Sequence, residues 1–236
     1  MSLASAADAP ARPVASPVAA RPRLSYLGTH ALTFEAPGAF DLTVQWRIWA
    51  MVEALADRPG VREAVPGVTN LTVFYVEPPA DPDAEFAALC ALWESGISRE
   101  IDGRLLTIDV EYGGDGGPHL AEVAELTGLD IAEIVRIHSA PEYIVYAIGS
   151  HAGYAYLGGL DARLFVPRRK VPLVSIPGGA VSVAGGQTGV SASTGPSGWH
   201  TIGHADTVFF DPRRHPPALL APGDRIRFVQ RGPIGC

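Results

Sequence analysis

Five of the seven histidines in this 236-residue chain lie between positions 119 and 204, and several occupy glycine-rich segments. Histidine is the side chain whose ordinary pKa lies closest to neutral pH, so it is the natural proton donor and acceptor of an enzyme site. The group therefore predicts acid–base chemistry at a site built from loops, with His151 and His204 as catalytic residues. An ordinary surface or hydrogen-bonded role is the alternative for each histidine. The five are His119, His138, His151, His200 and His204.

Polar and aromatic residues close to these histidines in sequence complete the predicted site. An amide and a hydroxyl at Gln187 and Thr188 would orient a polar substrate, and aromatic side chains would form an apolar wall with polar tips. The same aromatic residues are equally well explained as barrel core or interface. The predicted substrate-binding residues are Tyr154, Tyr156, Gln187, Thr188, Trp199, His200 and His119.

Other familiar chemistries lack their sequence signatures. The histidines show neither H-x-H nor H-E-x-x-H spacing, so we expect no metal site. No serine lies in a G-x-S-x-G elbow, and the glycine-rich loop 112–118 lacks the Lys-Ser/Thr of a phosphate-binding loop. We therefore expect no cofactor bound by this chain alone.

Residues 23–112 must form the first unit that supports such a site. Apolar runs rich in β-formers alternate with two segments of helical spacing, each opened by an aspartate N-cap. The order is β-α-β-β-α-β, the ferredoxin-like arrangement. The expected elements are a strand region over 23–35, a helix from 41, strands over 61–65 and 70–76, a helix from 81, and a closing strand over 104–112.

Residues 113–232 have a different pattern, with many more glycines and shorter apolar runs, and they predict a second unit. Two short helices come first, one stopping at Gly128 and the next opening at Asp130 with Glu133 as a capping-box partner. Short β-type runs separated by glycines follow, which favours a closed β-barrel over a doubly wound sheet. The fold class predicted is α+β, a ferredoxin-like domain followed by a barrel.

Composition limits the remaining possibilities. The chain is 47% apolar and 18% charged with a net charge of −7, so it lacks the basic footprint of a nucleic-acid-binding protein. No apolar run approaches the ~18 residues of a membrane span, so we expect no membrane role. Two cysteines exclude a disulfide framework and favour a cytoplasmic protein. The Ala- and Pro-rich segment 1–22 predicts a disordered tail.

Several long motifs occur in fixed order and carry a family resemblance. These motifs, together with the shorter segments Glu142–Tyr146 and Phe210–Pro212, make the chain similar to the allophanate hydrolase subunit 1 family over residues 24–230. This family includes the KipI-type kinase inhibitor and the B component of bacterial 5-oxoprolinase. The motifs are Tyr112-Gly-Gly-Asp-Gly-Gly-Pro-His-Leu120, Gly149-Ser-His-Ala-Gly-Tyr-Ala-Tyr-Leu-Gly-Gly-Leu160, Ile176-Pro-Gly-Gly-Ala-Val-Ser-Val-Ala-Gly-Gly-Gln-Thr-Gly189, Gly198-Trp-His-Thr-Ile-Gly203 and Leu220-Ala-Pro-Gly-Asp-Arg-Ile-Arg-Phe228.

The resemblance implies a ferredoxin-like domain, a cyclophilin-like barrel and a partner, the cyclophilin-like subunit 2 of the same family. It implies a subunit of a heteromeric 5-oxoprolinase- or allophanate-hydrolase-like enzyme acting on a small cyclic amide, urea-like or related carbonyl compound, with ATP used by the complete complex. A second hypothesis is a KipI-like, non-catalytic module that inhibits a histidine kinase. A third is a stand-alone enzyme of a specialised biosynthetic pathway.

This sequence departs from the family pattern inside the motifs. Where the family has arginine in Ile-Gly-Arg-Thr, this chain has His204, which removes a permanent anion clamp. His119 stands where the family has aspartate, and Ser150 and Ala152 replace Phe and Pro. These changes predict a divergent member with a different small substrate, or a site that is no longer catalytic.

Overall fold

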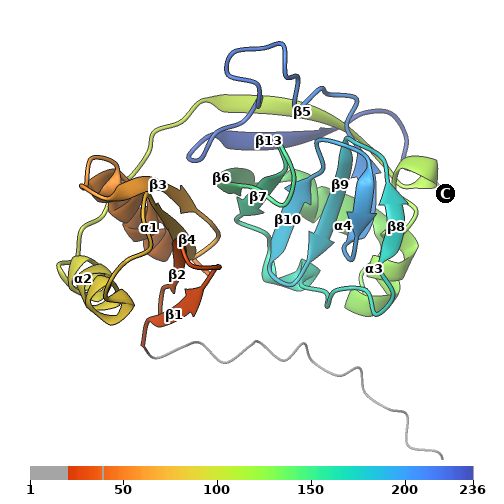
Figure 1. Cartoon of the computed structure of the whole chain (residues 1–236). Helices are drawn as coiled ribbons and strands as arrows, with labels where there is room; N and C mark the ends of the chain where they lie inside the picture. Colours follow the sequence, from red (N-terminus) through yellow and green to blue (C-terminus); the bar gives the residue numbers. More distant parts are fainter. Residues whose placement is uncertain (1–20, 39, 236) are drawn as a thin grey trace, which may run out of the picture.

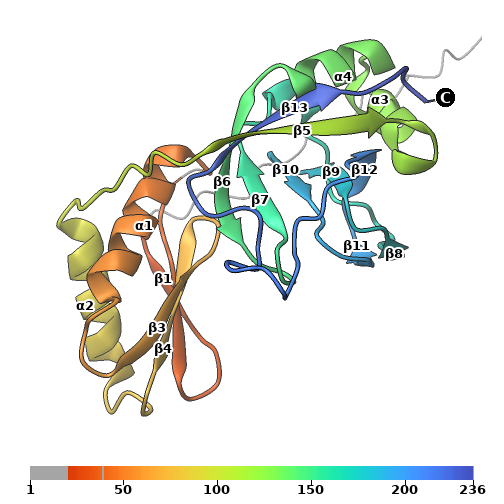
Figure 2. The same cartoon turned by 90° about the horizontal axis from the view of Figure 1, so that it is seen from above.

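The structure is a computed structural model that describes residues 21–38 and 40–235. The predicted tail at 1–22 lies almost wholly outside these residues. A four-stranded sheet with two helices stands beside a closed barrel with two helices (Figures 1 and 2). Within the described residues, no helix has both the length and the apolar character that a membrane crossing requires. The first unit contains β1 (Arg23–Tyr26), β2 (Ala31–Glu35), α1 (Leu42–Leu55), β3 (Val61–Pro66), β4 (Asn70–Tyr75) and α2 (Pro82–Glu94).

Both helices of the first unit begin where the sequence predicts. The carboxylate of Asp41 accepts a hydrogen bond from the Val44 amide at 2.9 Å, and Asp81 caps α2 in the same way, with Pro82 at its first position. The strands form an antiparallel sheet in the order β1-β2-β4-β3. The helices and the sheet enclose an apolar core that includes Phe34, Ile48, Met51, Leu71, Val73, Leu89 and Trp93.

Two expectations for the first unit are wrong. The strand region 23–35 is a hairpin, because Gly28 turns the chain with a φ of +65° between β1 and β2. The predicted closing strand 104–112 is β5 (Leu105–Tyr112), which lies in the barrel and not in the N-terminal sheet. The edge beside β2 is covered by β1 instead. The ferredoxin-like order over 23–112 therefore lacks its last strand.

Strand pairing and burial explain why β5 joins the barrel. It pairs in parallel with β13 (Arg225–Gln230) over six register positions and also pairs with β12 (His200–His204). Its alternate residues Ile108, Val110 and Tyr112 are buried in the barrel core. The buried carboxylate of Asp224 binds the backbone amide of Arg104 at 3.0 Å and fixes the start of both strands.

The closed barrel itself is confirmed, while its likeness to cyclophilin stays a prediction. The strand order is β10-β7-β6-β13-β5-β12-β9, and β9 pairs with β10 to close the ring. β8 and β11 form a separate two-stranded sheet. The remaining strands are β6 (Glu142–Ile148), β7 (Ala155–Gly158), β8 (Leu173–Ile176), β9 (Ala180–Ala184), β10 (Gln187–Val190) and β11 (Gly195–Ser197).

Two short helices precede β6, as predicted. α3 (Leu120–Thr127) ends at Gly128, whose φ of +71° is the left-handed conformation of a helix C-cap. α4 (Ile131–Ser139) begins at Asp130, whose carboxylate accepts from the Glu133 amide at 2.7 Å. Leu120 and Val123 of α3 and Ile134, Val135 and Ile137 of α4 are buried in the barrel core, and α4 lies along β13 (Figure 2).

One backbone carbonyl on β6 receives two hydrogen bonds from the first unit, and the Phe40 ring packs on Tyr146 beside it, with ring centroids 5.0 Å apart. The Tyr146 carbonyl accepts hydrogen bonds from the Gln45 amide and the Trp49 indole of α1, each at 3.1 Å. Gln45 is fully buried, and its other amide contacts are the Gly67 carbonyl and the Thr69 N–H. Because every polar group at this contact has a partner, the joint holds α1 firmly against the outside of β6.

Candidate functional site

The structure separates the five histidines into four places. His138 lies inside the barrel, and His151 lies in the loop between β6 and β7. His119 and His200 face each other at the start of α3 and β12, with ring centroids 6.2 Å apart. His204 ends β12. The predicted site therefore does not form as one cluster.

His138 and Thr188 belong to a hydrogen-bonded network in the barrel interior. The Thr188 hydroxyl donates to the Ser182 carbonyl at 3.0 Å, so it accepts from Nε2–H of His138 at 2.9 Å. Nδ1 of His138 then accepts from the Tyr112 hydroxyl at 2.8 Å. Burial lowers the pKa of His138 to about 3, which keeps the ring neutral. Both residues are fully buried, and their polar groups are used within the core.

The outer face of the barrel presents a second set of polar groups, which we call the outer strip. Thr201, Ser182, Gly189 and Tyr156 are register neighbours across β12, β9, β10 and β7. The hydroxyls of Ser182 and Thr201 are 3.1 Å apart, and both residues are almost completely buried. Side chains alternate between faces along a strand, so this row points away from the interior that Thr188 faces.

An aromatic cluster lies at the β7 and β10 end of the outer strip. The ring centroids of Tyr154 and Tyr156 are 4.8 Å apart, and each lies 6.1 Å from that of Trp199. The Tyr154 hydroxyl lies over Gly189, where a Cβ would come within 2.6 Å of it. Burial raises the pKa of Tyr154, so its hydroxyl stays protonated. Three of the predicted substrate contacts are thus brought together.

His151 lies at the edge of this cluster. Its ring is 5.2 Å from that of Tyr154, and its Nε2 is 3.3 Å from the hydroxyl of Ser191. The Ser191 hydroxyl donates to the Ser193 carbonyl at 2.9 Å, so the histidine Nε2–H is the donor to Ser191. The Ser191 proton is therefore not directed at His151, unlike that of a catalytic serine. Burial lowers the pKa of His151, so its ring is neutral near pH 7 and can accept a proton.

Gln187 adds an unsatisfied donor on the same side of the barrel. It is two residues from Gly189 on β10 and adjacent to the inward-facing Thr188, so its side chain lies on the outer face. Its amide nitrogen is buried and has no hydrogen-bond partner within the described residues. Four other buried side-chain nitrogens of the described residues are also unpaired, and each such donor would gain free energy from an acceptor such as water or a ligand's carbonyl oxygen.

His119 and His200 form a separate buried pair. Nδ1 of His119 accepts from the Thr201 amide at 2.9 Å, and burial lowers the pKa of its ring. Nε2–H of His200 donates to the Pro167 carbonyl at 2.9 Å, while its Nδ1 lies 3.7 Å from Glu122. Both rings hold backbone groups in place beside the aromatic cluster. Their substrate contacts stay a prediction.

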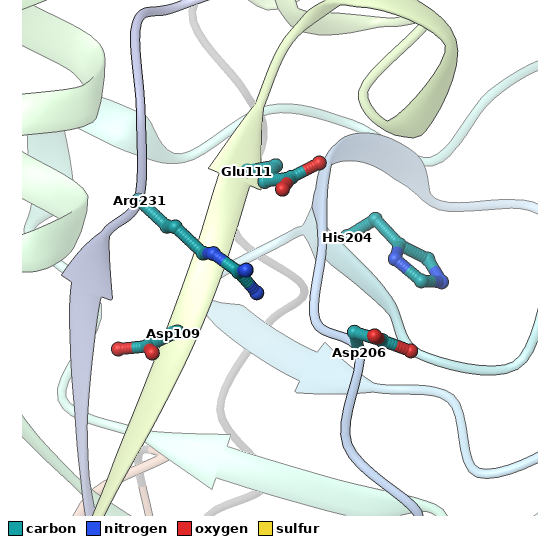
Figure 3. A pocket seen from close by; sticks show the side chains of 5 residues that line it. All are labelled: Asp109, Glu111, His204, Asp206 and Arg231. Carbon is teal, nitrogen blue, oxygen red and sulfur yellow. The ribbon is translucent and has the colours of Figure 1, made fainter.

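His204 lies in a different pocket of about 210 Å³, shown in Figure 3. Its Nε2–H donates to the Gly178 carbonyl at 2.9 Å, which leaves Nδ1 as the acceptor. In Figure 3 the Arg231 guanidinium reaches across β5 into the same pocket, so this pocket still contains an arginine although position 204 does not. The other lining residues are the carboxylates Asp109, Glu111 and Asp206.

A second pocket of about 330 Å³ lies against α4 and contains none of the predicted residues. Within the described part of the chain, no cluster of three or more His, Cys, Asp or Glu side chains could hold a metal ion.

Sequence reasoning missed several residues that the structure brings to these places. Ser182 and Thr201 pair through their hydroxyls on the outer face, and Arg231 joins His204 in one pocket. The alternation of β5, in which Asp109 and Glu111 point outward between buried residues, is a signal that could have located the carboxylates. No local signal could have located Arg231, because its place depends on β13 pairing with a strand about 120 residues earlier.

Comparisons with known proteins identify the family. The chain is 41% identical to the B component of 5-oxoprolinase from Escherichia coli O157:H7 over 89% of its own length and 97% of that protein. It matches the crystal structure of TTHA0988 with a TM-score of 0.70 and 33% identity, covering 86% of this chain but only 40% of that longer one. It shares the fold of Kluyveromyces lactis urea carboxylase with a TM-score of 0.76 at 16% identity, covering 94% of this chain and 23% of that one.

The relatives in sequence are named as subunits of an enzyme, which agrees with the expected enzyme subunit. The profile of the carboxyltransferase domain, subdomain C and D, matches residues 22–220. With this match and the 41% identity to the Escherichia coli protein, the chain belongs to the carboxyltransferase subdomain C and D family, together with the B component of 5-oxoprolinase.

Proposed function

We propose that this chain is the B component of a 5-oxoprolinase-type complex that opens a small cyclic amide. The observation that carries the proposal is its 41% identity to the Escherichia coli B component over 97% of that protein. The partner is a subunit 2 protein, and ATP is bound elsewhere in the complex. The substrate is 5-oxoproline or a related lactam.

The outer strip and its aromatic cluster are the part of the chain that we assign to substrate contact. A cyclic amide is flat and carries one carbonyl acceptor and one N–H donor. The buried amide nitrogen of Gln187 lacks an acceptor, and the hydroxyls of Ser182 and Thr201 offer both donors and acceptors. The rings of Tyr156 and Trp199 supply flat apolar walls. His151, neutral near pH 7, is the candidate base.

The proposal is tested by reconstituting the chain with its partner subunits and assaying ATP-dependent ring opening on 5-oxoproline and a panel of lactams. We expect a stable complex and turnover of at least one lactam. Absence of both a complex and turnover would overturn the proposal.

Two histidine variants test where the chemistry lies. We expect His151→Ala to lower kcat by roughly a hundredfold or more, the typical contribution of a general base. His30→Ala is the matched control, because His30 is exposed in the β1–β2 turn and bonds only Thr29 among the described side chains. If His204→Ala abolishes turnover and His151→Ala does not, the base belongs to the pocket of Figure 3 instead.

A further inference from the structure

In the part of the chain that the structure describes, the two-stranded sheet of β8 and β11 has unpaired outer edges, one of which belongs to β8. β8 pairs with β11 through Gly195 opposite Ile176 and Ser197 opposite Leu173. Among the described residues, β8 has no other strand neighbour, and Figure 2 shows this sheet at the outer margin of the barrel. A strand with an unpaired edge presents N–H and C=O groups that a further strand can bind.

The open strand and the segment before it also carry the two most exposed large apolar side chains of the described residues. Val174 is 89% exposed and Val171 is 75% exposed. Proteins usually protect an open edge with charged residues, proline or a covering segment. Pro172 limits pairing at the start of β8, but Val174 within the strand is β-branched and apolar, so it favours extended structure and gains free energy when it is buried.

Charge next to this edge indicates what would cover it. Arg168, Arg169 and Lys170 directly precede Val171, in a chain whose net charge is −7. Arg169 is paired with Glu122, whereas neither Arg168 nor Lys170 forms an ion pair within the described residues. A covering strand with acidic side chains would therefore meet complementary charge.

The edge is connected to the outer strip. The Arg169 amide donates to the Gly198 carbonyl at 2.8 Å, which extends the contact between the β8 and β11 segments up to Trp199. The Arg168 guanidinium lies over the Trp199 ring at 6.0 Å. A strand bound at β8 would thus end close to the aromatic cluster.

We propose that β8 receives an extended, acidic segment of the partner subunit, which adds a third strand to the β8–β11 sheet. This inference rests on the proposed function, because the occupant is the subunit 2 protein of the same complex. The added strand covers the exposed side chain of Val174, and its acidic residues hold Arg168 in its place over Trp199. Assembly then orders one wall of the substrate site.

The test is a calorimetric titration of the full chain with its subunit 2 partner. We expect Val174→Lys to weaken binding at least tenfold while the melting temperature stays unchanged, because the side chain is almost fully exposed. Val174→Ile keeps the β-branched apolar shape and should bind within about twofold of the wild type. Val76→Lys is the matched control, since Val76 is a 59% exposed valine in the N-terminal unit. Lys170→Glu should weaken binding and reduce its dependence on salt.

The possible results separate the two proposals. Partner binding by Val174→Lys within twofold of the wild type overturns the β8 interface and leaves the proposed function standing. No binding by the wild-type chain overturns both. If Val174→Lys only abolishes self-association in analytical ultracentrifugation, the edge binds a second copy of this chain, and the partner assignment is wrong.

Discussion

The inner and outer faces of β9, β10 and β12 both carry polar residues, but the two sets differ in how completely they are hydrogen-bonded. Inside, Thr188, His138 and Tyr112 form an ordered chain of hydrogen bonds that ends on the Ser182 carbonyl. Outside, the Ser182 hydroxyl has the Thr201 hydroxyl as its neighbour, and Gln187 has a buried amide nitrogen that is unpaired within the described residues. Satisfied networks stabilise a fold, whereas unsatisfied donors mark places where a ligand can bind.

Gln187 and Thr188 are adjacent in sequence but lie on opposite faces of the barrel wall. They are adjacent and lie in one glycine-rich motif, so the sequence predicts one shared role for both. Because a strand turns successive side chains to opposite faces, Thr188 points into the core and Gln187 points outward. One of the two is structural, and the other is a candidate for function.

The largest expected effect is loss of the inner network. Thr188→Val removes the acceptor of His138 and the donor to Ser182, so two buried groups lose their partners. We expect the free energy of unfolding to fall by about 2–3 kcal/mol, measured by urea denaturation. The outer-face control Thr201→Val loses one hydroxyl contact and should cost about 1 kcal/mol. Equal losses would remove the distinction between the faces.

The pH dependence of stability sharpens the same comparison. The pKa of His138 is about 3 in the fold and about 6.5 when unfolded, so the unfolded chain binds the extra proton. The free energy of unfolding is therefore highest above pH 6.5 and decreases as the pH falls towards 3. At pH 5 the loss due to His138 is about 2 kcal/mol. The lowered pKa values of His119 and His151 act in the same direction. Urea denaturation at pH 7 and pH 5 measures the loss, which His138→Asn should reduce.

A smaller effect is expected at the joint that holds the outer face of β6. Gln45→Ala removes hydrogen bonds to the Tyr146 and Gly67 carbonyls and from the Thr69 N–H. The Tyr146 carbonyl keeps its bond from Trp49, and Gly67 and Thr69 are only half-buried, so water can replace the amide there. We expect a loss of about 1–2 kcal/mol by urea denaturation. Gln230→Ala, at an exposed position, should change stability by less than about 0.5 kcal/mol. A change as small for Gln45→Ala would show that the joint is not rigid.

Local signals predicted most helices and strands but not every strand pairing. The caps at Asp41, Asp81 and Asp130 are local, and each helix begins where they place it. The membership of β5 depends on its pairing with β13, over 100 residues away, which no local pattern encodes. The five histidines do not form the predicted single cluster, because their positions also depend on strand pairing between distant segments. Tyr154, Tyr156 and Trp199 do meet, because the first two are neighbours on one face and β12 lies close to them.

If the outer face of the barrel is the substrate site, loss of the Gln187 side chain must impair catalysis. The direct test is kcat/KM for lactam ring opening by the reconstituted complex carrying Gln187→Ala, with Gln230→Ala as the control. We expect at least a tenfold loss for Gln187→Ala at unchanged stability, because its amide loses the carbonyl it binds in the transition state. A kcat/KM within twofold of the wild type, or an equal loss in Gln230→Ala, would contradict the assignment.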